Sequence, residues 1–212
     1  LLRAVGETGM SAILSFGMSD LPTIAHAFET LHKFGSRQIA LLQCTSQYPA
    51  PYDQVNLRVI ETFKKKLGCP VGLSDHSEGV HVPIAATALG AEIIEKHFTL
   101  GRNLPGVDHA ASLNVEQFKK MVRCIREIED AMGAGEKKIQ PDEFENARNM
   151  RRSLMAARRI NAGTFLAEDD ITAKRPGTGL PPTEIDKLLG KKILTDMEPE
   201  DFFSPEIIEG YG

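Results

Sequence analysis

Gly72-Leu73-Ser74-Asp75-His76 (72–76) and Ile93-Ile94-Glu95-Lys96-His97 (93–97) are the two stretches that decide the fold. Each is a short, mainly apolar run that ends in a histidine, which is typical of a buried strand. The segment between them, 82–89, has a helical pattern and is followed by the helix stop Gly90. A strand, a helix and a strand at this spacing predict a βαβ unit with parallel neighbouring strands. Both histidines should then lie at the carboxyl edge of the sheet, where α/β proteins hold their chemistry.

The two strand-end histidines are candidate ligands of a divalent metal. Imidazole nitrogens are common metal ligands, and Asp75 and Glu95 are close enough in sequence to orient a ring or to bind the ion directly. A histidine at a strand end is also often a hydrogen-bonded packing residue. Spacing alone therefore leaves both interpretations open, unlike the closed cysteine-rich sites that are recognised from spacing.

The composition is that of a soluble globular protein of one large or two small domains. The chain has 212 residues, of which 42% are hydrophobic and 25% charged. A net charge of −4 gives no basic surface for nucleic acid. No apolar run has the length of a membrane span, and the first residues do not resemble a signal peptide. Cys44, Cys69 and Cys124 are odd in number and unevenly spaced, which predicts reduced thiols in a cytoplasmic protein. We expect Cys44, on a strand, to be a core residue rather than a nucleophile.

A strand-plus-helix pattern recurs along the first part of the chain. Four such units, at roughly 25-residue spacing, cover 12–35, 38–67, 71–89 and 92–132. In the first, residues 12–16 are expected to be a buried strand. In the second, the helix is expected over 56–67. The repeat predicts part of a (β/α) barrel, although a flavodoxin-like open sheet of about five strands also fits the count.

The last helix of this series is predicted over Val115–Met132, with Asn114 as its cap and Gln117 completing a capping box. Its core-facing residues are expected at helical spacing: Phe118, Met121, Val122, Ile125 and Ile128.

A change in composition after this helix predicts a domain boundary. Residues 134–150 are polar and interrupted by Gly and Pro, so we expect a linker between a domain at 1–133 and a second domain at 151–212. The second domain is predicted to contain short strands at 154–157, 164–166 and 171–174 and a helix at 182–189. A domain this small buries little apolar surface by itself.

Six motifs, taken together and in order, resemble the sialic acid synthase family, which includes the legionaminic and pseudaminic acid synthases. They are LSFGM (14–18), LLQCTSQYP (41–49), GLSDH (72–76), ALGAEIIEKHFTL (88–100), PGVDHAASL (105–113) and KRPGTG (174–179). The resemblance implies an α/β fold: the C-terminal half of a (β/α)8 TIM barrel followed by a small SAF, or antifreeze-like, domain of the β-clip type. It further implies that the chain is the C-terminal part of a synthase. We therefore expect little activity from this part alone, since the family's upstream lysines and glutamate have no counterpart here.

The family reaction condenses phosphoenolpyruvate with an N-acetylated sugar aldehyde such as N-acetylmannosamine, giving a 2-keto-3-deoxy nonulosonate and phosphate. A divalent metal, Mn²⁺ or Mg²⁺, polarises the aldehyde. N-acetylmannosamine and 2,4-diacetamido-6-deoxy sugars both remain candidate acceptors.

The resemblance also implies roles for individual residues. His76 and His97 match the two metal ligands, and Glu95 and Asp108 match acidic residues that approach the metal and the sugar. Other positions match substrate-binding residues: Ser15, Ser46 and Ser74 near the phosphate, Tyr48 in the sugar pocket, and Arg175, which the small domain sends into the barrel of the other subunit. This last match implies a domain-swapped homodimer. One departure is Phe16, where the family usually has Thr beside the phosphate pocket.

Each of these residues also has a purely structural interpretation. Asp108 could cap a turn, Tyr48 could be part of a pocket wall, and Arg175 could be an exposed charge. At the level of the whole protein, one alternative is a non-catalytic fragment or paralogue that acts as a sugar-binding or dimerisation module. A second is another phosphoenolpyruvate-condensing barrel, such as an octulosonate-phosphate synthase. The KRPG motif within a SAF-like module argues against the second alternative, because those enzymes lack the module.

Overall fold

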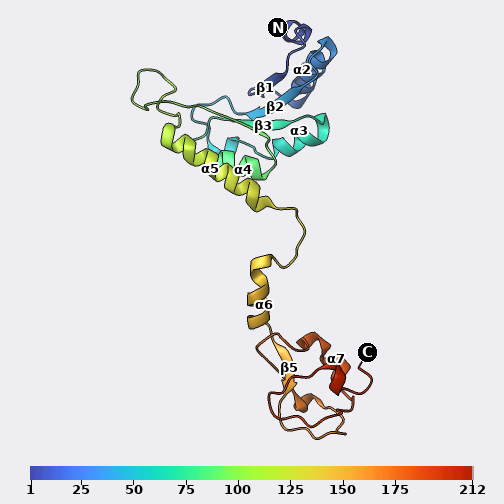
Figure 1. Ribbon diagram of the computed structural model, residues 1–212. Helices are drawn as coiled ribbons and strands as arrows, with labels where there is room; N and C mark the ends of the chain where they lie inside the picture. The colour runs from blue at the N-terminus through green and yellow to red at the C-terminus, as the bar shows by residue number, and fades with distance from the viewer. Residues whose placement is uncertain (212) are drawn as a thin grey trace. The chain divides into compact units, whose positions relative to one another are not determined.

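Residues 1–135 form one compact unit around a four-stranded parallel sheet. The computed structural model describes residues 1–211, so Gly212, the last residue of the expected second domain, lies outside the described residues. Neighbouring strands pair in the order β1-β2-β3-β4 (Figure 1), and they span Ala12–Phe16, Ile39–Cys44, Val71–Asp75 and Ile93–Lys96. The order contains no reversal. The four strands therefore lack the switch point that defines a doubly wound, flavodoxin-like sheet.

The helices of this unit gather on one face of the sheet. Side chains from α2 (Leu21–Phe34), α3 (Val59–Leu67) and α4 (His81–Ala88) share one core cluster with alternate residues of the strands. The fully buried members of this cluster include Leu31, Leu41, Ile60, Phe63, Val71 and Leu73. Because side chains alternate along a strand, the residues between them point to the opposite face. That opposite face carries the candidate site.

Local sequence accounts for where α2 and α5 begin. The Asp20 carboxylate accepts a hydrogen bond from the Thr23 backbone N–H at 3.0 Å, which caps α2. In α5 (Val115–Met132), the Asn114 side chain accepts from the Gln117 N–H, and the Gln117 side chain accepts from the Asn114 N–H. The predicted capping box of α5 is therefore confirmed.

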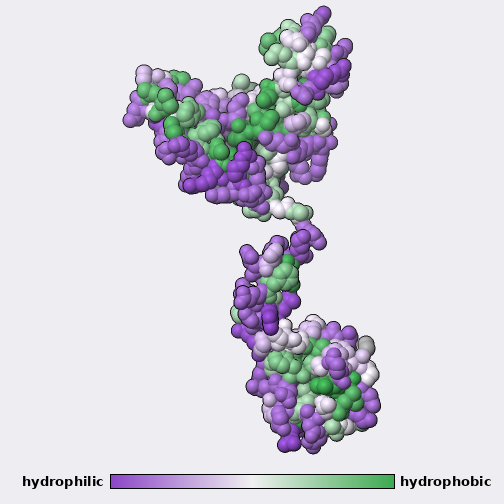
Figure 2. Space-filling view, in the orientation of Figure 1, coloured by the Kyte–Doolittle hydropathy of each residue, from purple (hydrophilic) through white to green (hydrophobic). Residues whose placement is uncertain are grey.

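The predicted core face of α5 is partly wrong. Met121 and Ile125 are buried, and Phe118 packs against them. Val122, however, is 40% exposed. It lies beside the apolar stripe, on the side where charged residues dominate, and Figure 2 shows this outer side of α5 as largely hydrophilic.

Two further expectations for the first unit need correction. The strand at 12–16 is not fully buried, because β1 is an edge strand and Ile13 on its open face is 61% exposed. The helix predicted from Asn56 begins only at Val59. Asn56 has a φ of 51°, a left-handed conformation that cannot continue a right-handed helix. A further short helix, α1 (Leu2–Glu7), precedes β1.

Residues 136–211 belong to a second compact unit with its own core. An antiparallel pair, β5 (Ser153–Ala156) and β6 (Ile171–Lys174), packs with α7 (Ile185–Leu188) and several isolated bridges. Its buried core contains Leu154, Ile160, Leu166, Leu188, Ile193, Met197, Phe203 and Ile208. The strand predicted at 164–166 is wrong, since only Phe165 makes a bridge, to Lys192. The helix predicted at 182–189 is a 3-10 turn over Pro182–Glu184 that continues into α7.

The expected linker at 134–150 is not uniformly irregular. A 3-10 turn at Pro141–Glu143 leads into α6 (Phe144–Met150), so only its first part lacks regular structure. In the part of the chain that the structure describes, no helix has both the length and the apolar composition that a bilayer span requires.

Asp170 stabilises the second unit through a buried carboxylate. This side chain accepts hydrogen bonds from the Ala167 backbone N–H at 2.9 Å and from the Arg158 Nε at 2.8 Å. Chiefly through the bond from Ala167, the pKa of Asp170 is lowered from its ordinary value of 3.8. A lowered pKa means that the unfolded state binds protons more readily. The stabilisation is therefore complete above the unfolded-state pKa and is lost as the pH falls through the folded-state pKa.

We expect Asp170→Ala to destabilise the second unit by about 2 kcal/mol at pH 7, because it removes two hydrogen bonds to a charged acceptor. The difference from the parent should disappear as the pH falls below 3.8. Urea unfolding at several pH values measures this. The neighbouring exposed residue gives the matched control, Asp169→Ala, for which no comparable loss is expected. A loss that does not depend on pH would show that the carboxylate charge is not the cause.

Candidate active site at the carboxyl edge of the sheet

Glu95 and two serines meet on the open face of the sheet. Ser74 and Glu95 are register partners on β3 and β4, so their side chains project on the same side. The Ser74 hydroxyl donates to Glu95 Oε1 at 2.5 Å, and the Ser15 hydroxyl from β1 donates to the same oxygen at 3.3 Å. Sequence analysis predicted all three as site residues. The structure brings them together around one carboxylate oxygen.

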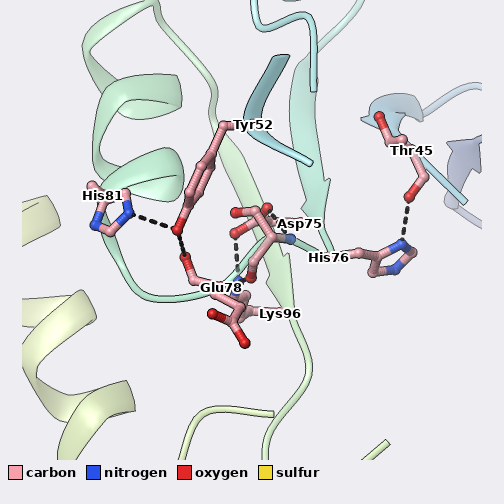
Figure 3. A network of polar contacts seen from close by, with 8 residues as sticks. Thr45, Tyr52, Asp75, His76, Glu78, His81 and Lys96 are labelled. Atoms are coloured by element: carbon pink, nitrogen blue, oxygen red, sulfur yellow. Dashed lines mark hydrogen bonds and ion pairs between the residues drawn. The ribbon is translucent and has the colours of Figure 1, made fainter. Parts of the chain in front are cut away.

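His76 lies just beyond the end of β3 with one ring nitrogen already engaged. Its Nδ1 is 2.8 Å from the Thr45 carbonyl oxygen (Figure 3). A carbonyl oxygen can only accept, so Nδ1 carries the proton of this hydrogen bond. In the neutral ring the other nitrogen, Nε2, then keeps its lone pair. A backbone carbonyl that fixes the tautomer in this way is a common partner of metal-binding histidines.

His97 and Tyr48 complete an aromatic group around His76. The His76 and His97 ring centroids are 5.1 Å apart, with an interplanar angle of 87°. The Tyr48 ring lies 4.1 Å from His76 and 5.4 Å from His97. Burial raises the pKa of the Tyr48 hydroxyl, with smaller effects from the nearby Cys44, Asp108 and Glu95. The hydroxyl therefore stays protonated at neutral pH and can donate a hydrogen bond.

Asp75 does not take part in this group. Its carboxylate lies on the opposite side of β3, where Lys96 Nζ donates to Oδ2 at 2.6 Å. Both side chains are almost completely buried, at 1% and 2% exposure. The expectation that Asp75 could orient a histidine ring or bind a metal is therefore wrong. The reason is the alternation of side chains along a strand, which sends Asp75 and His76 to opposite faces, as Figure 3 shows.

The residues present fit a metal ion only in part. The His76 and His97 rings are neighbours in a T-shaped arrangement, and the His76 tautomer leaves one lone pair free. Within residues 1–211, no group of three or more His, Cys, Asp or Glu side chains is placed to hold an ion. An ion at this edge would therefore take His76 and His97 from this chain and complete its coordination with other oxygen ligands, such as water or substrate.

Two other predicted site residues lie at this edge on loops. Asp108 is exposed on the long loop between β4 and α5, which extends away from the strands in Figure 1. The Ser46 hydroxyl lies against Gly17, so closely that a Cβ on Gly17 would come within 1.9 Å of it. Ser46 is thus positioned beside the end of β1. Phe16 packs with the helical core rather than toward the serines, so it does not obstruct them.

Cys44 and Arg175 belong to different units of the chain. Cys44 is half-buried on the open face, with its Sγ 3.8 Å from His76 Nδ1, so its assignment to the core is wrong. Burial raises the pKa of its thiol, which keeps it protonated. Arg175 belongs to the second unit, where it is exposed and donates from Nε to the Met150 carbonyl at 3.0 Å.

Sequence reasoning missed several residues that support the site. Thr45 holds His76 through a backbone carbonyl, and Lys96 neutralises Asp75, although neither role has a sequence signature. His109 lies on the same loop as Asp108, between β4 and α5. Its Nδ1 lies 2.7 Å from the Thr99 hydroxyl, a contact that anchors the loop bearing Asp108.

Comparison with known proteins supplies the family. Residues 1–137 match the NeuB family, and residues 151–206 match the SAF domain. The chain belongs to the NeuB family. One relative, the N,N'-diacetyllegionaminic acid synthase of Campylobacter jejuni, is 41% identical over 94% of this chain and 60% of its own length. The human N-acetylneuraminate-9-phosphate synthase is 34% identical over all of this chain and 59% of its own.

A solved NeuB-type structure supports the same assignment. The N-acetylneuraminic acid synthetase of Leptospira borgpetersenii, solved in complex with citrate, is 38% identical with a TM-score of 0.63. The match covers 68% of this chain and 50% of the Leptospira chain. This chain spans about 60% of the length of the curated NeuB relatives named above.

Proposed function

We propose that this chain is the C-terminal part of a nonulosonic acid synthase, comprising half of a (β/α)8 barrel and a SAF domain. In the complete protein it would condense phosphoenolpyruvate with an N-acetylated sugar aldehyde. The observation that carries the proposal is the grouping of His76, His97, Tyr48 and Glu95 at the carboxyl edge of a singly wound parallel sheet. Membership of the NeuB family supports it.

In the proposed reaction, C3 of phosphoenolpyruvate forms a bond to the aldehyde carbon, whose oxygen takes up a proton. Water adds at C2, and the C–O bond to phosphate breaks, which leaves a 2-keto acid. A Mn²⁺ or Mg²⁺ ion held by His76 and His97 would polarise the aldehyde carbonyl. The hydrogen bond to Thr45 engages His76 Nδ1 and leaves the lone pair of Nε2 free for such an ion.

Ser15, Ser46 and Ser74 would bind the phosphate through their hydroxyl groups. At present Ser15 and Ser74 both donate to Glu95, and phosphate oxygens would compete for the same two protons. Phosphate binding therefore requires both hydroxyls to turn away from Glu95. The freed carboxylate could then accept a proton or a sugar hydroxyl, which suits a catalytic role for Glu95.

Tyr48 and Asp108 would contact the sugar. Tyr48 offers a protonated hydroxyl and a ring face, and Asp108 is close enough to raise the pKa of Tyr48. Arg175 would reach the sugar of a second subunit in a domain-swapped homodimer. In the second unit its guanidinium has only one hydrogen bond among the described residues, to the Met150 carbonyl, which leaves donors for a partner.

The acceptor sugar that we propose to test first is a 2,4-diacetamido-6-deoxy sugar. Two relatives named N,N'-diacetyllegionaminic acid synthase are 41% and 40% identical to this chain. The human N-acetylneuraminate-9-phosphate synthase and a Campylobacter jejuni pseudaminic acid synthase are 34% and 35% identical. The higher identity to the legionaminic acid synthases favours a diacetamido sugar over N-acetylmannosamine as the acceptor.

Phosphate release from phosphoenolpyruvate tests the proposal. The complete protein that contains this chain, supplied with Mn²⁺, is expected to release phosphate only when an acceptor sugar is present, and faster with the diacetamido sugar than with N-acetylmannosamine. The 212-residue chain, assayed in parallel, is expected to release far less. Sugar binding by the complete protein without phosphate release from any acceptor would instead favour a sugar-binding module.

A further inference from the structure

Asp75 and Lys96 form a buried ion pair beside the candidate metal ligands. The two residues are register partners on β3 and β4, and their side chains are 1% and 2% exposed. His76 follows Asp75 and His97 follows Lys96. The pair therefore links the last paired positions of the two strands directly before each histidine.

The ion pair also holds the backbone on the far side of His76. Lys96 Nζ donates to the Ser77 carbonyl oxygen as well as to Asp75, and Asp75 Oδ1 accepts from the Ser77 backbone N–H at 2.9 Å. His76 is thus enclosed between two residues, Asp75 and Ser77, that are fixed by the same three bonds. No hydrogen bond of the His97 ring occurs within residues 1–211, so its direction depends on the backbone that follows Lys96.

We propose that Asp75 and Lys96 are positioning residues that set the separation and orientation of His76 and His97 from behind the sheet. The proposal rests on the metal site proposed above. Because the pair lies on the helical side of the sheet, neither residue contacts an ion or a substrate on the open side. Their effect reaches the site only through the backbone of His76 and His97.

Measurement of Mn²⁺ affinity tests this role without any assay of catalysis. The double variant Asp75→Asn/Lys96→Met leaves no unpaired buried charge and keeps an acceptor for the Ser77 N–H. Titration of free Mn²⁺ by electron paramagnetic resonance is expected to show affinity about 10- to 100-fold weaker than that of the parent chain, the range for residues that orient metal ligands. Circular dichroism should show that the fold is kept.

A surface pair supplies the matched control. Lys64 and Glu92 also connect α3 to the start of β4, but they are 38% and 55% exposed and lie 3.7 Å apart. The variant Lys64→Met/Glu92→Gln makes the same change of charge and should leave Mn²⁺ affinity unchanged. Parent-like affinity in a folded Asp75→Asn/Lys96→Met variant would overturn the proposal.

Nuclear magnetic resonance of the imidazole nitrogens separates this proposal from that of the metal site. The parent should show His76 protonated at Nδ1, and the double variant should show a mixture of tautomers as the bond to Thr45 loosens. If the parent binds no Mn²⁺, the metal site is refuted, and only the nitrogen spectrum can test the positioning role of Asp75 and Lys96. In that case, an unchanged His76 tautomer in the double variant would refute the positioning role.

A single variant covers the case in which the double variant does not fold. Asp75→Asn keeps an acceptor for the Ser77 N–H while it removes the ion pair with Lys96. We expect this smaller change to weaken Mn²⁺ affinity by about threefold. Complete loss of an orienting residue is expected to cost more, about 10- to 100-fold. Unchanged affinity and an unchanged His76 tautomer would overturn the proposal.

Discussion

Replacing His76 with alanine is expected to weaken Mn²⁺ binding by more than about 100-fold, because loss of a ligand should exceed the 10- to 100-fold cost of losing a residue that only orients one. The chain supplies two neighbouring imidazoles and no third clustered ligand among its described residues, so one histidine cannot hold the ion by itself. Titration of Mn²⁺ into the 212-residue chain measures the effect directly. In the complete protein, phosphate release should fall with it.

The control is a histidine far from the sheet edge. His26 is exposed on α2, and its ring makes no hydrogen bond to another side chain or backbone group within residues 1–211. His26→Ala should therefore bind Mn²⁺ like the parent. Equal affinities for the His76→Ala and His26→Ala variants would remove His76 from the metal site and leave it as a packing residue that bonds to Thr45.

Gly72→Ala is expected to destabilise the first unit by at least about 3 kcal/mol, at the upper end of the range for overpacking. A Cβ at this position of β3 would lie 2.1 Å from the Ile93 carbonyl oxygen and 2.6 Å from Leu42 Cδ2. The carbonyl belongs to the backbone of β4 and cannot turn aside as a flexible side chain could. The two strands must therefore separate, and these are the strands that carry His76 and His97.

Hydrogen exchange followed by mass spectrometry measures this effect segment by segment. Protection should fall in β2, β3 and β4 and remain unchanged in β5, because residues 136–211 have a separate core. Gly101→Ala is the matched control, since its Cβ would meet only Leu104 at an ordinary 3.5 Å. Parent-like protection of β3 in the Gly72→Ala variant would contradict the predicted clash.

The helices and strands of the first unit could be predicted because local chemistry and the core agree. Asn114 caps α5 as expected, and all four strands lie within a few residues of their predicted places. The errors arise where the burial of a residue depends on how helices and strands pack, which the local sequence pattern does not show. Val122 has an apolar side chain at an almost correct helical angle, and only the three-dimensional packing of α5 shows that it lies outside the buried stripe.

The sequence predicted which residues would gather at the sheet edge, but not the directions of their side chains or their hydrogen-bond partners. Strand-end spacing correctly placed His76 and His97 at one edge, yet it could not show that Asp75 faces away toward Lys96. The hydrogen bond from His76 to Thr45 could not be predicted either, because any residue type can supply a backbone carbonyl. The roles of Asp108 and Arg175 stay predictions drawn from the family resemblance.

The sequential order of β1 to β4 has a consequence for how the chain folds during synthesis. β2, β3 and β4 each pair with the strand made immediately before, so each of these three units emerges beside a partner that already exists. None of these three strands has to wait for a later segment of this sheet, and short separations between contacting segments favour fast folding. We expect ribosome-bound intermediates to gain protease resistance in steps, one for each completed unit.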